Sequence, residues 1–136
     1  MPHALTGTWI ANIDRSRRDP NHLFHRATMR FEVVDDRVSV VYGGVNASGR
    51  HEQGGQTFHA DGQEHVVPEA TGVVAISTLE PRALYSIGKK DGLTIGRATY
   101  EVSEDGRMLT ATVSGLDASG KAFDQVIVFD REEPAA

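Results

Sequence analysis

Short segments of alternating polar and apolar residues recur about every ten positions along this 136-residue chain, with turn-forming residues between them. The clearest alternation covers residues 25–34, where Met29, Phe31 and Val33 are separated by arginine and glutamate. Such alternation is typical of a half-buried β-strand, and no segment repeats its apolar residues with the period of an amphipathic helix. The chain is therefore expected to fold as an all-β protein.

The strand pattern appears in ten segments of the chain. They are residues 6–14, 25–34, 37–45, 51–60, 63–67, 72–79, 82–89, 93–103, 108–115 and 121–131. Tight turns between them favour antiparallel neighbours, and closure into a barrel is favoured because it removes exposed sheet edges. We therefore predict one domain spanning residues 1–136, a single antiparallel up-and-down β-barrel of about eight to ten strands.

Two segments are expected to depart from this regular pattern. Residues 15–24 are polar apart from Leu23 and Phe24, and they are interpreted as a turn or one short helical turn over the barrel mouth. Paired glycines at positions 54 and 55 predict a bulge or strong bend in the strand formed by residues 51–60.

The composition limits the partners and the chemistry available to the protein. Its formal charge of −5 argues against a nucleic-acid or anionic-membrane partner, since such binding relies on a clustered positive face. The chain contains no cysteine, which excludes disulfide and thiolate chemistry. It has no apolar run of membrane-spanning length, and residues 1–5 do not resemble a secretion signal. A cytoplasmic location is therefore expected.

The Gly-Thr-Trp sequence at residues 7–9 is expected to anchor one end of the barrel. Gly7 lets two backbones pass closely, and Trp9 is the single tryptophan of the chain. Together with Arg131 at the end of the last strand, this sequence resembles the Gly-x-Trp motif and late basic residue of the lipocalin and calycin barrels. In those barrels the two elements pack together and close the base.

The body of the chain resembles, more specifically, a group of uncharacterised bacterial lipocalin-like proteins. The similarity is carried by residues 7–9, 61–64, 103–110, 115–121 and 128–131. It implies a barrel that holds a ligand, without indicating which ligand. The chain departs from secreted lipocalins in having no cysteine.

The leading hypothesis is that a small, largely apolar molecule binds inside the barrel, with the protein acting as a carrier or sensor. The predicted wall residues are Met29, Phe31, Val40, Tyr42, Tyr85, Ile127 and Phe129, and the predicted polar contacts are His25, Gln53 and Gln125. Arg97 has two interpretations: an inward arginine that pairs with a ligand carboxylate, as in fatty-acid-binding barrels, or a surface arginine on the outer face. No cofactor is expected.

The alternative hypothesis is a cofactor-free isomerase, lyase or hydrolase that uses the same cavity. Its catalytic candidates are His25, His51, His59, Tyr42 and Tyr85. His51 and His59 share strand parity, so an inward orientation would bring them towards His25 for acid–base chemistry or metal binding. With the opposite orientation they are solvent-facing residues of an edge strand. No metal site is predicted, because neither a cysteine companion nor a helical histidine pair accompanies them.

The residue types alone do not separate binding from catalysis. Tyr100 belongs with Tyr42 and Tyr85 as either a wall residue or a group that polarises a ligand carbonyl. A convergent acid–base pair in the cavity would favour an enzyme, whereas scattered polar groups would favour a binding protein. A homodimer joined through the polar residues 51–59 is a third alternative.

Overall fold

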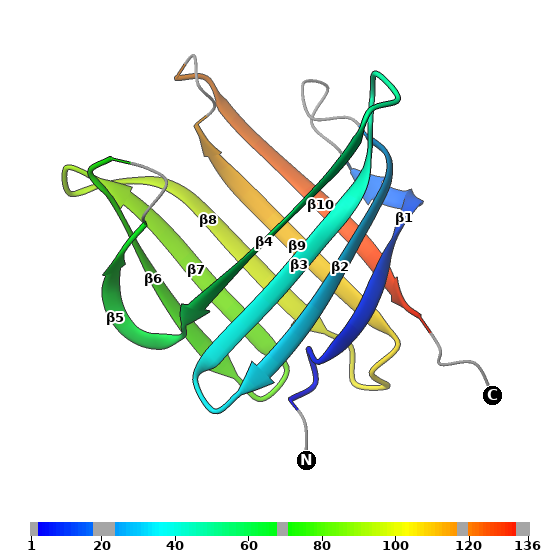
Figure 1. The fold of residues 1–136 in the computed structure, drawn as a ribbon, viewed down its shortest axis with the longest axis horizontal. Helices are drawn as coiled ribbons and strands as arrows, with labels where there is room; N and C mark the ends of the chain where they lie inside the picture. Colours follow the sequence, from blue (N-terminus) through cyan, green and yellow to red (C-terminus); the bar gives the residue numbers. More distant parts are fainter. Residues whose placement is uncertain (1–2, 18–23, 68–70, 117–119, 133–136) are drawn as a thin grey trace.

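The computed structural model describes residues 3–17, 24–67, 71–116 and 120–132. Within these ranges the chain forms ten antiparallel strands and no helix (Figure 1). The strands are β1 (Gly7–Arg17), β2 (Phe24–Val34), β3 (Arg37–Asn46), β4 (His51–His59), β5 (Asp61–Val66), β6 (Val73–Glu80), β7 (Ala83–Lys90), β8 (Leu93–Val102), β9 (Met108–Leu116) and β10 (Ala122–Arg131). The described part of the chain thus contains no helix that could cross a membrane.

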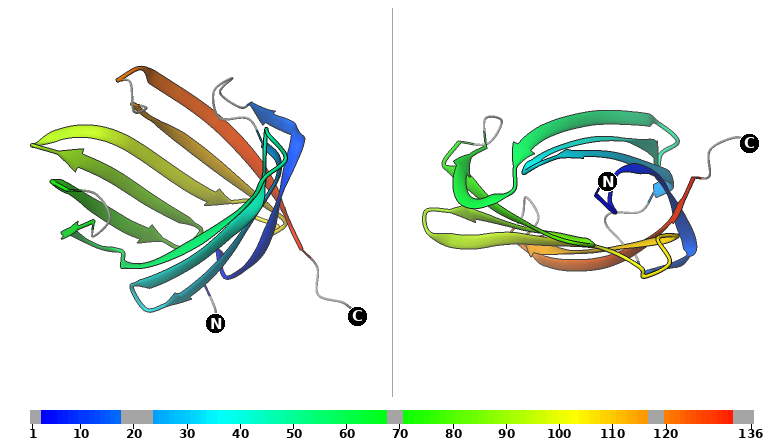
Figure 2. Two further views of the ribbon diagram at one scale, coloured as in Figure 1. Left: turned by 45° about the horizontal axis from the view of Figure 1, so that its top comes forward. Right: turned by 90° about the horizontal axis from the view of Figure 1, so that it is seen from below.

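All ten strands belong to one sheet, in the order β4-β3-β2-β1-β10-β9-β8-β7-β6-β5. Pairing of β1 with β10 joins the two ends of the chain, and the sheet curves into a flattened, nearly closed ring (Figure 2). The two edges of the sheet are β4 and β5. The predicted all-β, antiparallel, up-and-down barrel is therefore confirmed.

Two local predictions were wrong. Residues 15–17 continue β1 as a strand and do not form the expected turn, while residues 18–23 lie outside the described residues. The expected bulge at Gly54 and Gly55 is absent, because β4 pairs with β3 without a shift of register from Arg37–His59 to Val45–His51. These glycines instead leave room for neighbouring groups, as described below for Gly54.

One of the irregular parts of the barrel lies in β1, between Asn12 and Arg17. The β1–β10 register shifts there, since Asn12 pairs with Val128 but Arg17 pairs with Val126. The Ser16 hydroxyl donates to the Asn12 carbonyl at 2.7 Å and accepts the Val128 N–H at 2.9 Å. This side chain replaces the backbone bonds that the bulge removes, so β1 can bend without leaving those groups unpaired.

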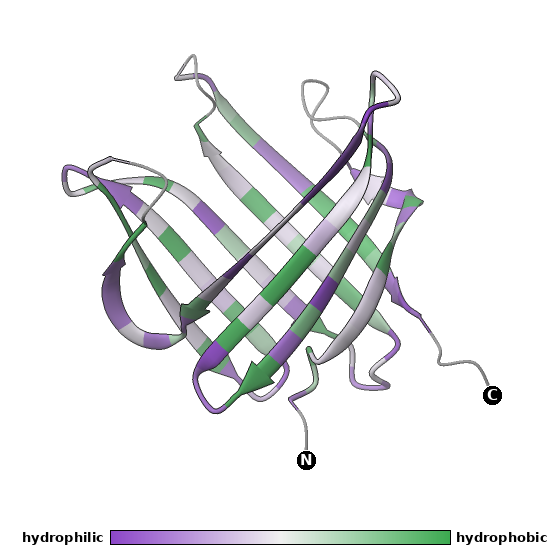
Figure 3. Ribbon diagram, viewed as in Figure 1, coloured by the Kyte–Doolittle hydropathy of each residue, from purple (hydrophilic) through white to green (hydrophobic). Residues whose placement is uncertain are grey.

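Alternation along the strands places apolar residues on the inner face of the barrel, and Figure 3 shows hydrophobic and hydrophilic residues alternating along the ribbon. Cross-strand partners share a face, so the pairs Phe31–Val40 and Tyr100–Ala111 identify the inner face of four strands. The buried cluster comprises Leu5, Trp9, Phe31, Val38, Val40, Ala60, Leu84, Val102, Leu109, Ala111, Ile127 and Phe129. Burial of this cluster is the main stabilising contribution to the fold.

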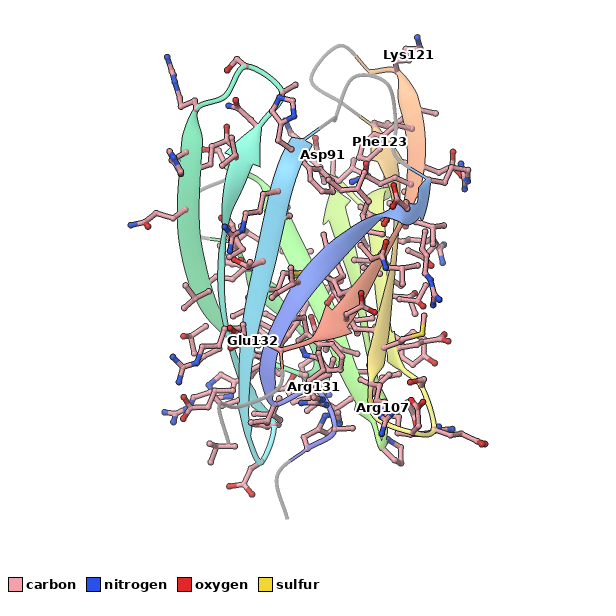
Figure 4. The ribbon with its side chains drawn as sticks, turned by 90° about the vertical axis from the view of Figure 1, so that its right-hand side faces the viewer. Asp91, Arg107, Lys121, Phe123, Arg131 and Glu132 are labelled. Atoms are coloured by element: carbon pink, nitrogen blue, oxygen red, sulfur yellow. The ribbon has the colours of Figure 1, made fainter. Side chains whose placement is uncertain are left out.

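The base of the barrel is closed by Arg131, which stacks on Trp9. The guanidinium carbon lies 4.1 Å from the centre of the indole ring. Its nitrogens donate hydrogen bonds to the backbone oxygens of Ala4 at 2.6 Å, Thr6 at 2.8 Å and Gly106 at 2.7 Å. Figure 4 shows Arg131 at this end of the molecule, next to Glu132. One side chain therefore joins the segment before β1, the β8–β9 turn and the end of β10.

Gly7 and Trp9 both lie against the Arg131 side chain at this end of the barrel. Gly7 has a φ of 134°, and a Cβ atom at this position would lie only 2.6 Å from Nη1 of Arg131. The Trp9 ring is fully buried and donates its Nε1–H to the backbone oxygen of Leu5 at 2.9 Å. A glycine is required at position 7 because any side chain would displace the arginine that closes the base.

Candidate functional site

A cavity of about 300 Å³, here called the outer chamber, opens inside the barrel on the side away from Arg131. Its walls come from β2, β3 and β4 on one side and from β8, β9 and β10 on the other. The lining residues are Phe24, Arg26, Ala27, Thr28, Met29, Tyr42, Gly43, Gly44, Val45, Asn46, Glu52, Tyr100, Ala111, Val113, Gln125, Ile127 and Phe129. Most of this lining is apolar, which suits the body of a small hydrophobic molecule.

A second cavity of about 230 Å³, the inner chamber, lies deeper between β2, β3 and β4 and the facing strands β7 and β8. It is lined by Met29, Phe31, Val40, Tyr42, Gln56, Phe58, Leu84, Ser86, Ala98 and Tyr100. Met29, Tyr42 and Tyr100 line both chambers, which shows that the chambers adjoin. A molecule longer than either chamber could therefore extend across both.

Polar groups are few in the chambers and differ in how they are bonded. Ser86 hydrogen bonds to the buried Ser77 at 2.8 Å between their hydroxyl oxygens. Near the mouth, the Asn46 amide donates to a carboxylate oxygen of Glu52 at 2.8 Å. Tyr100 contacts the Phe31 ring edge-to-face, with ring centres 5.6 Å apart, and burial raises the pKa of its hydroxyl. The tyrosine is thus a neutral hydroxyl group at ordinary pH.

Seven of the ten ligand-binding residues proposed from the sequence line the chambers. They are Met29, Phe31, Val40, Tyr42, Gln125, Ile127 and Phe129. Alternation along β2 and β10 indicated the inner face of those strands because the largest apolar residues of each share one face. The chambers are therefore lined by residues whose orientation follows directly from strand parity.

Gln53, Tyr85 and Arg97 lie on the outer face of the barrel, so the predicted inward orientation was wrong for Gln53 and Tyr85. Each is one position out of phase with a chamber residue: Gln53 follows Glu52, Tyr85 follows Leu84, and Arg97 precedes Ala98. Tyr85 pairs across the sheet with Thr78 and Thr99, and 40% of its surface is exposed. Arg97 is likewise exposed, which is the second of its two interpretations.

The histidine candidates do not meet inside the barrel. His25 is exposed and its Nε2 lies 3.1 Å from the backbone oxygen of Ala47. His51 and His59 share a face of β4, as expected, but it is the outer face of an edge strand. Among the described residues, no histidine lines either chamber and no group of three potential metal ligands is present.

Two histidine–aspartate pairs lie at the gap between the sheet edges β4 and β5. Nδ1 of His59 is 3.0 Å from Asp36, and Nε2 of His65 is 2.9 Å from Asp61. The two imidazole rings are 6.1 Å apart and border a pocket of about 410 Å³, which shares Gln56, Phe58 and Ser86 with the inner chamber. Hydrogen bonding from Gln63 and His65 lowers the pKa of Asp61, which stays ionised. The His59–Asp36 pair is exposed, whereas His65 is half-buried and pairs across the sheet with Ala75, on the face of β6 that also carries Ser77. Neither pair lines the outer or the inner chamber.

The β4 and β7 residues of the inner chamber were not among the ligand-binding residues predicted from the sequence. Gln56 and Phe58 line it from β4, and Leu84 and Ser86 line it from β7. Phe58 is the single large apolar residue of residues 51–59, and its parity is opposite to that of His51 and His59. Because a large apolar residue is expected to face the core, Phe58 indicates that His51 and His59 lie on the outer face of β4.

Gly54 makes room for the ring of Tyr42, which lines both chambers. A Cβ atom at position 54 would lie 2.7 to 2.9 Å from three atoms of that ring. We expect Gly54→Ala to push the ring into the chambers, lowering the free energy of unfolding by about 1–3 kcal/mol and weakening ligand binding. Gly96→Ala is the control, since its nearest neighbour would be 3.6 Å away. Urea unfolding and dye titration of both variants test this, and equal behaviour of the two would contradict it.

No protein-family model and no curated protein matches the sequence, but solved structures share its fold. The wild-type fluorescent protein UnaG superposes with a TM-score of 0.64 at 18% identity, covering 94% of this chain and 97% of that chain. Zebrafish ileal bile acid-binding protein complexed with cholic acid gives 0.60 at 14% identity, covering 95% and 99%. Lobster apocrustacyanin A1 gives 0.50 at 12% identity, covering 98% and 63%.

These similarities extend over nearly the whole chain, although sequence identity is low. Together with the strand order and the closed base, they show that the chain has the lipocalin-like barrel fold of the calycin type. The fold is shared among proteins with different ligands, so the lining of the two chambers is what bears on the function of this protein.

Proposed function

We propose that the protein binds a small, largely apolar molecule in the outer and inner chambers and acts as a carrier or sensor of that molecule. The observation that carries this proposal is the pair of adjoining chambers with mostly apolar walls inside a barrel whose base is closed. Each methylene group that a ligand buries there contributes about 0.8 kcal/mol to binding. The similarity to a bile acid-binding protein complexed with cholic acid supports the same kind of site.

Native mass spectrometry of the protein purified from its own host tests the proposal directly. We expect a small molecule that is retained under gentle conditions and lost on denaturation. Its mass would identify the ligand class. Retention of zinc or iron instead would contradict the proposal and would point to the histidines.

A tryptophan at position 113 should block the outer chamber. Val113 lines this chamber, whereas its neighbour Thr112 is exposed on the outer face of the same strand. We expect Val113→Trp to weaken binding of the uncharged dye Nile red by at least about tenfold, which corresponds to about 1.4 kcal/mol. Thr112→Trp is the matched control and should bind the dye like the original protein. Unchanged dye affinity in a folded Val113→Trp variant would contradict binding in the barrel.

The cofactor-free enzyme stays a prediction, as do the homodimer and the cytoplasmic location. The polar side chains of the described chamber walls are tyrosine, glutamine, serine, threonine and asparagine, with Arg26 and Glu52 near the mouth, and no histidine lies beside a carboxylate in either chamber. Scattered polar groups of this kind favour binding over catalysis.

A further inference from the structure

The inner chamber carries no formal charge on any of its lining residues. Its ten lining side chains are apolar except for two tyrosines, one glutamine and one serine. In the outer chamber the charged lining residues are Arg26 and Glu52, both near the mouth. A ligand that extends from the mouth towards the inner chamber therefore moves from charged surroundings into uncharged ones.

Arg26 does not supply a cation to the inner chamber. It pairs across the sheet with Val45, which in turn pairs with His51 on the outer face, and its side chain is exposed. The Glu52 carboxylate lies at the same end of the barrel and has the opposite charge. Among the described residues that line the outer chamber, the one positive and the one negative charge therefore offset each other, so this lining does not favour an anion.

Tyr100 presents an unbonded hydroxyl at the junction of the chambers. It lines both of them, and no described group forms a hydrogen bond with it. Among the described residues, the Thr6 hydroxyl is the single side-chain atom that is both fully buried and unbonded. Because the Tyr100 hydroxyl is also unbonded, it is not fully buried, and the open space beside it is that of the chambers. A ligand oxygen there would give this hydroxyl its missing partner.

A carboxylate would be poorly stabilised at the same place. Moving it from water into the chamber removes its hydration, and no cation in the described walls of the inner chamber compensates for the loss. An uncharged hydroxyl or carbonyl group has a much smaller hydration free energy to lose. One hydrogen bond from Tyr100 compensates for a large part of that loss.

We propose that the barrel selects uncharged ligands: apolar molecules with a neutral hydroxyl or carbonyl group that enters first and hydrogen bonds to Tyr100. Carboxylates of the same length bind more weakly. This inference rests on the proposed function, because it specifies the ligand class of the same chambers.

The test compares ligands that differ in charge but share one chain length. Nile red is bound to the purified protein and displaced at neutral pH with decan-1-ol, methyl decanoate or decanoate. We expect the alcohol and the ester to displace the dye at concentrations at least about tenfold lower than decanoate. Displacement by decanoate at the same concentration as the alcohol would overturn the inference while leaving the proposed function intact.

Tyr100→Phe tests the role of the hydroxyl itself. It should weaken binding of decan-1-ol by about three- to tenfold and leave decanoate binding unchanged. Tyr85→Phe removes the same group from the outer face and should change neither ligand. Equal changes for both ligands, or equal effects of the two variants, would overturn the role of Tyr100. Failure of Nile red and all three ligands to bind the original protein would instead overturn the proposed function.

Discussion

Arg131→Ala is expected to lower the free energy of unfolding by about 3–5 kcal/mol, the largest effect of any arginine substitution in the described chain. The guanidinium donates hydrogen bonds to three backbone oxygens from two separate segments and stacks on the fully buried Trp9. Its removal leaves those oxygens without donors and opens the base around the indole ring. Urea unfolding followed by tryptophan fluorescence measures the change, since Trp9 is the single tryptophan.

Arg17→Ala provides the matched control for this prediction. Arg17 forms an ion pair with Asp124 at 2.8 Å, and both side chains are 63% exposed. Exposed ion pairs contribute little because water screens them and the side chains lose entropy, so the expected change is below about 1 kcal/mol. If both arginine variants lost the same stability, Arg131 would not be the closing element of the base.

The contact between Arg131 and Trp9 involves residues that could be recognised in the sequence. A glycine two residues before the single tryptophan and a basic residue at the end of the last strand are identifiable by position alone. Alternation along residues 25–34 and 121–131 likewise indicated the inner face, because the largest apolar residues there share one parity. Met29, Ile127 and Phe129 were assigned to the chamber walls on this basis.

Parity is uninformative where both faces of a strand are apolar or both are polar. Residues 82–89 contain Leu84 on the inner face and Ile87 on the outer face, so the direction of Tyr85 was ambiguous. Residues 51–59 are polar on both faces apart from Phe58, and the histidines were weighed as possible inner residues for that reason. The orientation of such strands is set by packing against their neighbours, which the sequence of one strand does not contain.

The chambers themselves could not be predicted from residue types. Their space depends on which inner positions carry small side chains, such as Gly44, Ala98 and Ala111. Gly54 was interpreted as a bulge signal, yet it accommodates the ring of Tyr42. A glycine in a strand indicates close approach or irregular backbone, and only the paired strand distinguishes the two.

Gly44→Ala is the second substitution with a large expected effect. Gly44 lines the outer chamber from β3, next to the register shift between β2 and β3. A Cβ atom there would overlap the carbonyl oxygen of Arg26 and lie 3.0 Å from Cα of Ala27. These are backbone atoms and cannot rotate away. The strands must therefore separate, and we expect a loss of about 2–3 kcal/mol in the free energy of unfolding.

Gly43→Ala makes this prediction specific, because the adjacent glycine faces the opposite side of the same strand. A Cβ atom at position 43 would meet its nearest neighbours at 3.6 Å, an ordinary contact distance. The free energy of unfolding of Gly43→Ala should change by less than about 1 kcal/mol. It can increase, because alanine loses less backbone entropy than glycine on folding. Separation of β2 from β3 in Gly44→Ala should also widen the outer chamber and weaken Nile red binding, whereas Gly43→Ala should bind normally. Equal stability and equal dye affinity in the two variants would contradict this prediction. They would show that the shape of the outer chamber does not depend on the close approach of the backbones at Gly44.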